Sequence, residues 1–282
     1  MGELKFKADC ECSLKDFLIN KEGVSKRFLS KLKRTEKGIT RNGLLIRTVD
    51  MVYKGDVIVL KTEDESFLEP NPDLDVRIAF ENESLVVFDK PVGMPVHPSI
   101  KHQGDTLGNF FAAKYPNLTF RPVNRLDRDT SGLCLAAKNP YAAVTLQNSV
   151  KKVYYAVAEG NTEDYGTIDL PIAREKESII KRTVRSDGQQ AVTHYKAINR
   201  NEKYTLLEIN LETGRTHQIR VHFSFIGHPL AGDDMYGGDC SIIENQALHC
   251  GRLSFYDPLS GELINVSSPI RDDMKKLLIK GE

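Results

Sequence analysis

The order of apolar segments is the feature that most constrains this chain. From about Val76 onward, segments typical of strands outnumber segments typical of helices, and VTHYKAI is followed by YTLLEINL with no helix between them. Strands that adjoin without a long crossover pair antiparallel, because a parallel connection needs a dozen or more residues. The sequence therefore predicts an α+β domain with a mainly antiparallel central sheet and flanking helices and loops.

The expected elements of this domain follow from apolar spacing. Strands are predicted at LVVFDK, GLCLAAK, VYYAVAE, VTHYKAI and YTLLEINL. Helices are predicted at TLGNFFAAKY, YAAVTLQNSV, RTHQIRVHFSFI and DDMKKLLIK. On the strand after Lys152, Tyr154 and Ala156 should share one face and Tyr155 the other. On the helix after Arg215, Ile219 and Phe223 should face the core, with Arg220 at the margin.

The first 61 residues predict a separate basic unit. They carry 14 Lys or Arg against 8 Asp or Glu, a surplus that is compatible with contact to phosphates but equally typical of a solvated helix face. Two short helices are expected, the second capped by Ser25, followed by a hairpin turn at Asn42-Gly43. Residues 62–75, acidic and containing two prolines, are predicted to be a linker, and residues 76–282 the larger domain.

Several classes of protein are excluded by what the chain lacks. It has no run of about 18 apolar residues and no apolar segment near its start, so we expect neither a membrane span nor a secretory leader, and a cytoplasmic protein. Its five cysteines form no C-x-x-C pair, which argues against a disulfide framework. Four histidines raise the possibility of a metal, but they lack a metal-binding spacing: His97, His217, His222 and His249.

The stretch VNRLDRDTSG carries the most distinctive chemistry. Asp127 lies between Arg125 and Arg128, just ahead of a predicted turn formed by Asp129 and the residues to Gly132. Two arginines can stabilise an ionised carboxylate and hold it in place. Such a carboxylate is a salt-bridge partner, a base or a nucleophile, and the local sequence leaves these roles open.

Five segments together are similar to the RluA/RluD-type pseudouridine synthases. They are DKPVGMPVHP, RLDRDTSG, the pattern K-x-Y-x-A, TGRTHQIRVH and HPLAGDDMYG, in the order and spacing of that family. The likeness covers about residues 76–270. The preceding unit, with its basic second helix and closing Gly-Asp-Val-Ile, resembles the S4 RNA-binding domain.

The resemblance implies a function and a set of site residues. The family isomerises uridine in RNA to pseudouridine without cofactor or metal. Its catalytic aspartate, active-site tyrosine and basic partner fall on Asp127, Tyr154 and Arg220. Further substrate- or RNA-binding residues are expected from the same segments: Asn124, Arg125, Arg128, His97, Arg215 and His217. In the S4-like unit, RNA contacts are expected from the second helix: Lys26, Arg27, Lys31, Lys33 and Arg34.

One position departs from the family. Asn124 stands where the family usually has His, and an amide does not ionise near neutrality. We expect activity to survive, with the role of this position left open, for example in placing a flanking nucleotide.

Two other functions remain as alternatives. One is an RNA-binding protein without activity, although Asp127 is retained. The other is a glycoside or nucleoside hydrolase, which would need a second carboxylate such as Asp129 or Asp233. Ribosomal RNA is favoured over transfer RNA as the substrate, and the chain is expected to act as a monomer.

Overall fold

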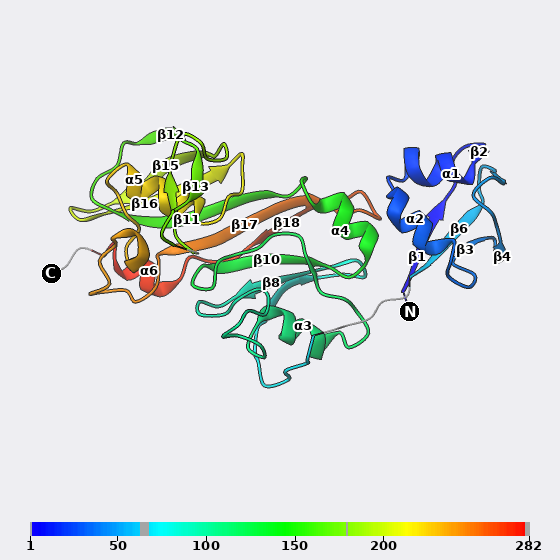
Figure 1. Cartoon of the computed structure of the whole chain (residues 1–282), viewed down its shortest axis with the longest axis horizontal. Helices are drawn as coiled ribbons and strands as arrows, with labels where there is room; N and C mark the ends of the chain where they lie inside the picture. Colours follow the sequence, from blue (N-terminus) through cyan, green and yellow to red (C-terminus); the bar gives the residue numbers. More distant parts are fainter. Residues whose placement is uncertain (1, 63–67, 179, 280–282) are drawn as a thin grey trace.

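A large antiparallel sheet organises the protein (Figure 1). The computed structural model describes residues 2–62, 68–178 and 180–279. Within these residues the main sheet has ten strands, in the order β12-β15-β16-β11-β17-β10-β8-β7, with β18 beside β17 and β9 beside β10. In this sheet β10 runs parallel to β17, while the remaining neighbours described run antiparallel. The predicted α+β architecture is confirmed.

The strands of the main sheet include all five that the apolar spacing predicted. Their bounds are β7 Arg77–Glu81, β8 Leu85–Lys90, β9 Arg121–Pro122, β10 Ser131–Ala137, β11 Lys151–Glu159, β12 Tyr165–Asp169, β15 Val192–Arg200, β16 Tyr204–Leu211, β17 Leu248–Tyr256 and β18 Leu263–Ser267. A short hairpin lies outside this sheet, formed by β13 Ile172–Arg174 and β14 Arg182–Val184.

Short helices flank the sheet (Figure 1). They are α3 Leu107–Lys114, α4 Pro140–Leu146, α5 Gln218–Phe225, the 3-10 helix η2 Asp234–Tyr236 and α6 Asp272–Lys276. Each α-helix overlaps one of the four predicted segments and is shorter than predicted, and α4 begins one residue before its segment. Asn139 caps α4 by accepting the amide of Ala142, and Thr106 caps α3 with a reciprocal bond to Asn109.

The two faces of β11 belong to different apolar clusters. Tyr154 and Ala156 pack in the main core, which also holds Ile219 and Phe223 of α5, whereas Val157 packs in a second cluster with Met274. This alternation confirms the predicted orientation of Tyr154 and follows from the two-residue repeat of a strand. The main core therefore joins the sheet to the helix that carries Arg220.

Residues 2–62, here called the small unit, have a sheet and an apolar core of their own. The elements of the small unit are β1 Gly2–Lys7, β2 Cys12–Ser13, α1 Leu14–Asp16, the π-helix η1 Phe17–Lys21, α2 Lys26–Leu32, β3 Ile39–Arg41, β4 Leu44–Leu45, β5 Met51–Val52 and β6 Val57–Thr62. The first predicted helix is thus one short α-helical turn that continues as a π-helix. Ser25 caps α2 through the amide of Phe28, as predicted.

The turn at Asn42-Gly43 follows its expected chemistry. Both residues have positive φ, of 50° and 83°, which is the conformation that a two-residue hairpin turn requires. The small unit lies at one end of the molecule, next to α4 (Figure 1). There the ring of Phe6 meets that of Tyr141 edge to face at 5.2 Å.

None of the helices in the described ranges combines the length and the apolar character needed to cross a bilayer. Of the predicted linker, residues 63–67 lie outside the described residues, and Leu68–Val76 contain no strand or helix.

Candidate active site

Asp127 lies on the turn that leads into β10. The amide of Thr130 donates to the carbonyl of Asp127 at 3.1 Å, which closes the turn, and β10 begins at the next residue. Ser131 and Gly132, predicted as part of the turn, therefore already belong to the strand. The Asp127 side chain keeps 30% of its surface exposed, so the turn presents a carboxylate to a ligand from the end of a buried strand.

Arg220 of α5 joins Asp127 to a second, buried carboxylate. Its Nη1 donates to Oδ2 of Asp127 at 3.3 Å, while Nε and Nη2 donate to the two oxygens of Asp233, each at 2.7 Å. The planar guanidinium suits this two-sided arrangement, because its donors form a rigid fork. The prediction that Arg220 lies at the helix margin is wrong: the residue is buried, since its charge is matched by Asp233.

The two arginines beside Asp127 in the sequence have other positions. Arg128 binds Asp129 through Nε and Nη2, at 2.9 and 3.0 Å. Arg125 is exposed and has no hydrogen bond to Asp127 within the described residues. The expectation that these neighbours hold the carboxylate is therefore wrong, because the cation that contacts it comes from α5.

Tyr154 projects from β11 into the main core, where its backbone lies across from Cys250 of β17. Burial raises the pKa of the phenol well above its ordinary value, and Cys250 and Asp127 act in the same direction. The phenol is therefore neutral near pH 7. A neutral aromatic ring at this position offers a face against which a base can stack.

His217 lies directly before α5 and has a left-handed backbone, with φ 57° and ψ 19°. This conformation costs roughly 1–3 kcal/mol for a residue with a β-carbon. Its Nε2 is 3.8 Å from Oδ2 of Asp127, and its Nδ1 is 2.8 Å from the hydroxyl of Tyr236. Burial lowers the pKa of His217, against an opposing effect of Asp127, so the imidazole is neutral near pH 7.

Lys90 is a buried charged residue beside the site that the sequence analysis did not single out. Its ammonium group is buried at the end of β8 and donates to three backbone carbonyls, those of Pro91, Met94 and Arg128, at 2.7–2.9 Å. Burial lowers the pKa of Lys90 to about 8, so the ammonium form still dominates at neutral pH. Lys90 thus ties the proline-rich loop to the turn of Asp127. The sequence signals were a lysine at the end of an apolar strand and its place in the segment DKPVGMPVHP.

Asn124 does not face a ligand. Its side chain is buried, its Oδ1 accepts the amide of Leu135 at 2.8 Å and its Nδ2 donates to the carbonyl of Leu133 at 3.1 Å. Both ends of the amide are therefore engaged with β10. The expectation that Asn124 contacts substrate or a flanking nucleotide is corrected to a structural role in holding the segment before Asp127.

The other predicted contacts lie at the surface. His97 is exposed, packs its ring on Phe120 at 5.3 Å and has a pKa lowered by burial and by Arg125. Arg215 is exposed and donates to the carbonyl of Gln190 at 3.0 Å. His222, one of the four histidines considered for a metal, is buried, and its ring nitrogens lie at hydrogen-bond distance from the Thr193 hydroxyl and the Leu170 carbonyl.

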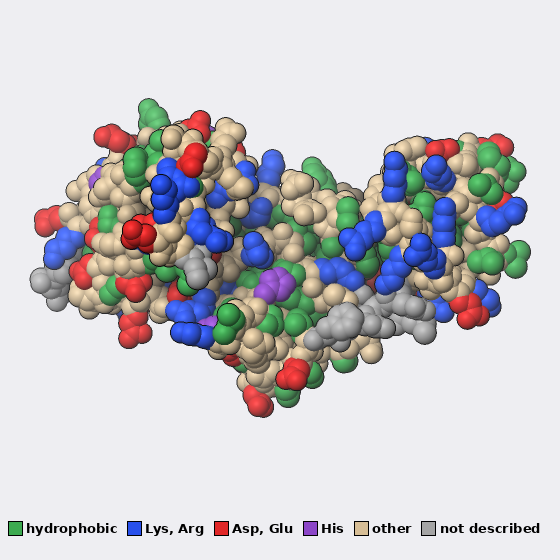
Figure 2. All heavy atoms as spheres, viewed as in Figure 1, with side chains coloured by type: hydrophobic (Ala, Val, Ile, Leu, Met, Phe, Trp, Pro, Cys, Tyr) green, Lys and Arg blue, Asp and Glu red, His purple; other side chains and the backbone are tan. Residues whose placement is uncertain are grey.

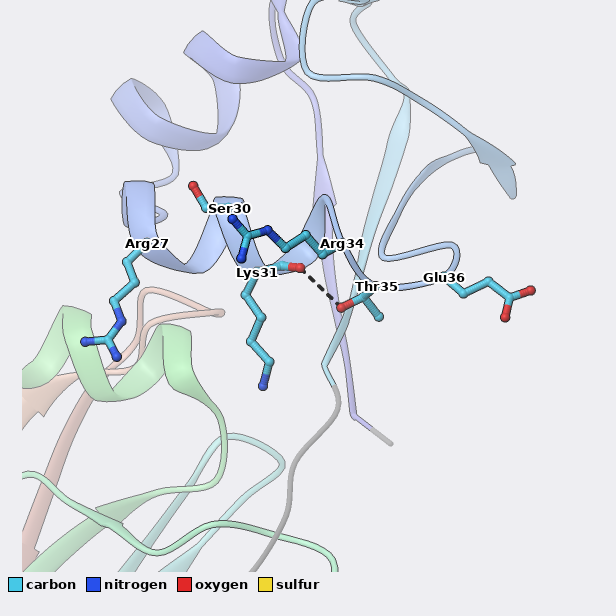
Figure 3. Close-up of a pocket in the computed structure, with 6 residues that line it drawn as sticks. All are labelled: Arg27, Ser30, Lys31, Arg34, Thr35 and Glu36. Carbon is cyan, nitrogen blue, oxygen red and sulfur yellow. Dashed lines mark hydrogen bonds between the residues drawn. The ribbon is translucent and has the colours of Figure 1, made fainter.

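The basic side chains of the small unit line a shallow hollow on α2. Arg27, Lys31 and Arg34 belong to this hollow, and Figure 3 shows Arg27 and Lys31 extending from the helix toward the larger domain. All five predicted contacts are exposed, but only Lys26, Arg27 and Lys31 lie on α2, because the helix ends at Leu32, before Lys33 and Arg34. Leu29 and Leu32 are buried. Figure 2 shows Lys and Arg side chains on the small unit and on the same face of the larger domain.

Comparison with known proteins identifies the class. The sequence model of a family described as RNA pseudouridylate synthase matches residues 84–225, which include Asp127, Tyr154 and Arg220. Among solved structures, human RNA pseudouridylate synthase domain containing 1 superimposes with a TM-score of 0.59, at 25% identity, over 72% of this chain and 86% of that one. The fold and site therefore define an RNA pseudouridine synthase.

Curated relatives narrow the class further. The chain is 40% identical to the uncharacterised RNA pseudouridine synthase YjbO of Bacillus subtilis, over 92% of this chain and 96% of the relative. It is 37% identical to ribosomal large subunit pseudouridine synthase D of Pseudomonas aeruginosa, over 85% of this chain and 82% of the relative. The chain belongs to the RluA/RluD-type RNA pseudouridine synthases.

Proposed function

We propose that this enzyme isomerises specific uridines of ribosomal RNA, with Asp127 as its catalytic carboxylate. The single observation that carries the proposal is the position of Asp127, exposed on a turn and held by Arg220 from α5. The choice of RNA rests on the Pseudomonas aeruginosa relative, whose name specifies the large ribosomal subunit. We place the enzyme in the cytoplasm and expect it to act as a monomer.

The reaction requires one bond to break and another to form on the same base. The N1–C1′ bond breaks, the base turns, the C5–C1′ bond forms, and the proton lost from C5 is balanced by one gained at N1. Asp127 attacks C1′ of the sugar as the N1–C1′ bond breaks, and the bond between Asp127 and C1′ breaks again when the C5–C1′ bond forms, while Arg220 holds Oδ2 of the carboxylate. Because the buried Asp233 already balances the charge of Arg220, the arginine remains in place as the substrate enters and leaves.

Tyr154 has two candidate roles at this site, packing against the base and taking the C5 proton. Its raised pKa supports packing, because a neutral phenol is a poor proton acceptor. The target base must first leave its stack, at a cost of a few kcal/mol. We propose that Arg125 and Arg215, which are exposed, contact phosphates and help to offset this cost.

We further propose that residues 1–61 form an S4-like RNA-binding domain. The exposed cations of α2 support this proposal, as do their orientation toward the larger domain and the shared basic face (Figures 2 and 3). In this arrangement α2 contacts the phosphates of the same RNA whose uridine enters the Asp127 site.

The positions of Asp129 and Asp233, the two candidates for a second catalytic carboxylate, argue against the hydrolase alternative. Asp129 is bound on both oxygens by Arg128, and Asp233 is fully buried against Arg220. Neither is placed as a general acid beside a leaving group.

The decisive test compares the full-length enzyme with Asp127→Asn on ribosomal RNA from cells lacking the gene. We expect the unaltered enzyme to convert one or a few uridines, detected by selective chemical labelling, and Asp127→Asn to convert none while binding RNA with nearly the same affinity. Asp129→Asn is the matched control and should retain activity. Full activity of Asp127→Asn would refute the assignment, and release of free uracil would establish hydrolysis instead.

The role of α2 is tested through the salt dependence of RNA binding. Replacing Arg27, Lys31 and Arg34 by Gln should reduce the slope of log K against log salt by about 2–3, because each phosphate contact contributes roughly 0.7–0.9. Replacing Lys275 and Lys276 on α6 is the control and should leave the slope unchanged. An unchanged slope in the α2 variant would show that this helix does not contact phosphate.

A further inference from the structure

Tyr236 contacts two residues of the site, Arg220 and His217, and also the backbone of Arg182. Its ring lies under the guanidinium of Arg220 at 5.0 Å and meets the ring of His217 edge to face at 5.7 Å. Its hydroxyl is 2.8 Å from Nδ1 of His217 and 2.9 Å from the amide nitrogen of Arg182. The residue is 7% exposed, so this hydroxyl has to find its partners within the protein.

The groups around the Tyr236 hydroxyl determine which hydrogen bond it accepts and which it donates. The Arg182 amide can only donate, so the Tyr236 oxygen accepts that bond. The phenolic hydrogen then needs an acceptor, and Nδ1 of His217 is the one that the described residues provide. If Nδ1 carried a hydrogen instead, the phenolic hydrogen would be left without a partner. Nδ1 therefore accepts, and a neutral His217 carries its hydrogen on Nε2.

That tautomer points a donor at Asp127. The Nε2 of His217 lies 3.8 Å from Oδ2 of Asp127, the oxygen that also accepts from Arg220. This oxygen therefore has a hydrogen bond from Arg220 and the Nε2 of His217 as a close neighbour, at a distance longer than a hydrogen bond. Oδ1 has no hydrogen-bond partner among the residues described, so it is the oxygen left for the substrate.

The backbone of His217 is built to keep the ring in this place. Its left-handed conformation is braced by Gln218, whose Oε1 accepts from the Arg215 amide at 3.0 Å and from the Thr213 hydroxyl at 2.9 Å. The next turn of α5 follows at once, with the amide of Val221 donating to the His217 carbonyl. A strained position that the surrounding contacts hold in this way is typical of a functional site.

We propose that Tyr236 fixes the Nε2–H tautomer of His217, and that this pair, with Arg220, orients Asp127 so that Oδ1 faces the sugar. Tyr236 is thus a positioning residue that acts through His217. The inference rests on the proposed catalytic role of Asp127. The charged or titratable groups around His217 are Asp127, Arg220, Asp233, Arg182 and Tyr236 itself.

The first experiment reads the tautomer without using activity. The full chain is labelled with ¹⁵N-histidine, the His217 signals are assigned by their loss in His217→Gln, and the ring nitrogen shifts are measured at pH 7.5. We expect a single Nε2–H tautomer in the unaltered protein and loss of this preference in Tyr236→Phe. An Nδ1–H tautomer, or an unchanged tautomer in Tyr236→Phe, would overturn the inference. Neither outcome depends on whether Asp127 is catalytic.

The second experiment is a double-mutant cycle on RNA modification. Tyr236→Phe should lower kcat about tenfold, the factor that corresponds to roughly one hydrogen bond, with KM for RNA changed less than twofold. In the His217→Gln background, where there is no tautomer to fix, Tyr236→Phe should have almost no further effect. Tyr204→Phe, an equally buried tyrosine in the cluster of Met274, is the control.

Two results of this cycle would contradict the proposal. Equal losses from Tyr236→Phe in both backgrounds would assign the tyrosine a structural role that is independent of His217. A loss confined to KM would place it in RNA binding. If Asp127→Asn itself proved active, the proposed function would fail, and the tautomer measurement would still stand on its own.

Discussion

Replacing Lys90 by Met removes a buried charge while keeping the length of the side chain. In the structure the ammonium group satisfies the carbonyls of Pro91, Met94 and Arg128. Methionine offers no donor, so these three carbonyls lose their partner. The change therefore loosens the proline-rich loop and the turn of Asp127 together.

The size of the effect follows from two opposing contributions. Each carbonyl left without a donor costs about 1–3 kcal/mol, or roughly 6 kcal/mol for the three at about 2 kcal/mol each. Against this, burial lowers the pKa of Lys90 from 10.5 to about 8, which means that folding with the charged amine costs about 3 kcal/mol that the variant avoids. The net expectation at pH 7 is a loss of about 3 kcal/mol in the free energy of unfolding.

The dependence on pH gives this prediction a specific signature. The folded pKa of Lys90 lies below its ordinary value, so between about pH 8 and 10.5 the unfolded chain holds more protons than the folded one. In that window the contribution of Lys90 to stability rises with pH, by up to about 3 kcal/mol, and Lys90→Met lacks this rise. The deficit of the variant should therefore be larger at pH 9.5 than at pH 7.

Urea unfolding followed by circular dichroism at pH 7 and 9.5 measures both effects. Lys152→Met is the matched control, because Lys152 also has a pKa lowered by burial but donates to a single carbonyl, that of Val150. Its deficit at pH 7 should be clearly smaller. Equal stability of Lys90→Met and the parent at pH 7, or a deficit that does not change with pH, would refute the reasoning.

Two further substitutions test other contacts of the site. Gly132→Ala should cost about 3 kcal/mol or more, because φ is +101° and an added β-carbon would lie 2.3 Å from a backbone oxygen of β17; Gly214→Ala, where nothing lies within 4 Å, should change the midpoint of thermal unfolding little. Asp233→Asn should cost about 3–5 kcal/mol by removing the buried charge partner of Arg220 and leaving only Asp127, whereas the exposed Asp234→Asn should be nearly neutral. An unfolding midpoint equal to that of the parent protein, in either Gly132→Ala or Asp233→Asn, would contradict the contacts on which that prediction rests.

Patterns of apolar spacing predicted the fold class and five of the ten strands of the main sheet, whereas β7, β9, β12, β17 and β18 were not predicted. The five predicted strands, the antiparallel sheet and the caps and turns at Ser25 and Asn42 were all found, because each depends on local chemistry that the sequence displays. The helices were predicted too long, since apolar residues continue past the point where hydrogen bonding stops. The π-helical continuation at Phe17 had no sequence signal that we recognised.

The site was harder to predict because its contacts join distant segments. Asp127 was singled out by its arginine neighbours, yet the arginine that contacts it is 93 residues away in the chain. The charge of Arg220 could not be placed in the interior until Asp233 was known to lie beside it. The buried position of Lys90 could not be predicted either, because its partners are backbone carbonyls, which carry no sequence signature.

The amide of Asn124 has a consequence for how the chain leaves the sheet. Strand β9 ends at Pro122, and the amide of Val123 still donates to the Leu135 carbonyl at 2.7 Å. Beyond it the Asn124 side chain, not a peptide group, pairs with the Leu133 carbonyl and the Leu135 amide of β10. The main chain can therefore leave the sheet and form the turn of Asp127, while β10 keeps its hydrogen bonds. Such a side chain must donate and accept at the same time, which an amide or a neutral imidazole can do and a carboxylate or an aliphatic group cannot. At Asn124 this requirement is met by an amide, which donates and accepts without ionising.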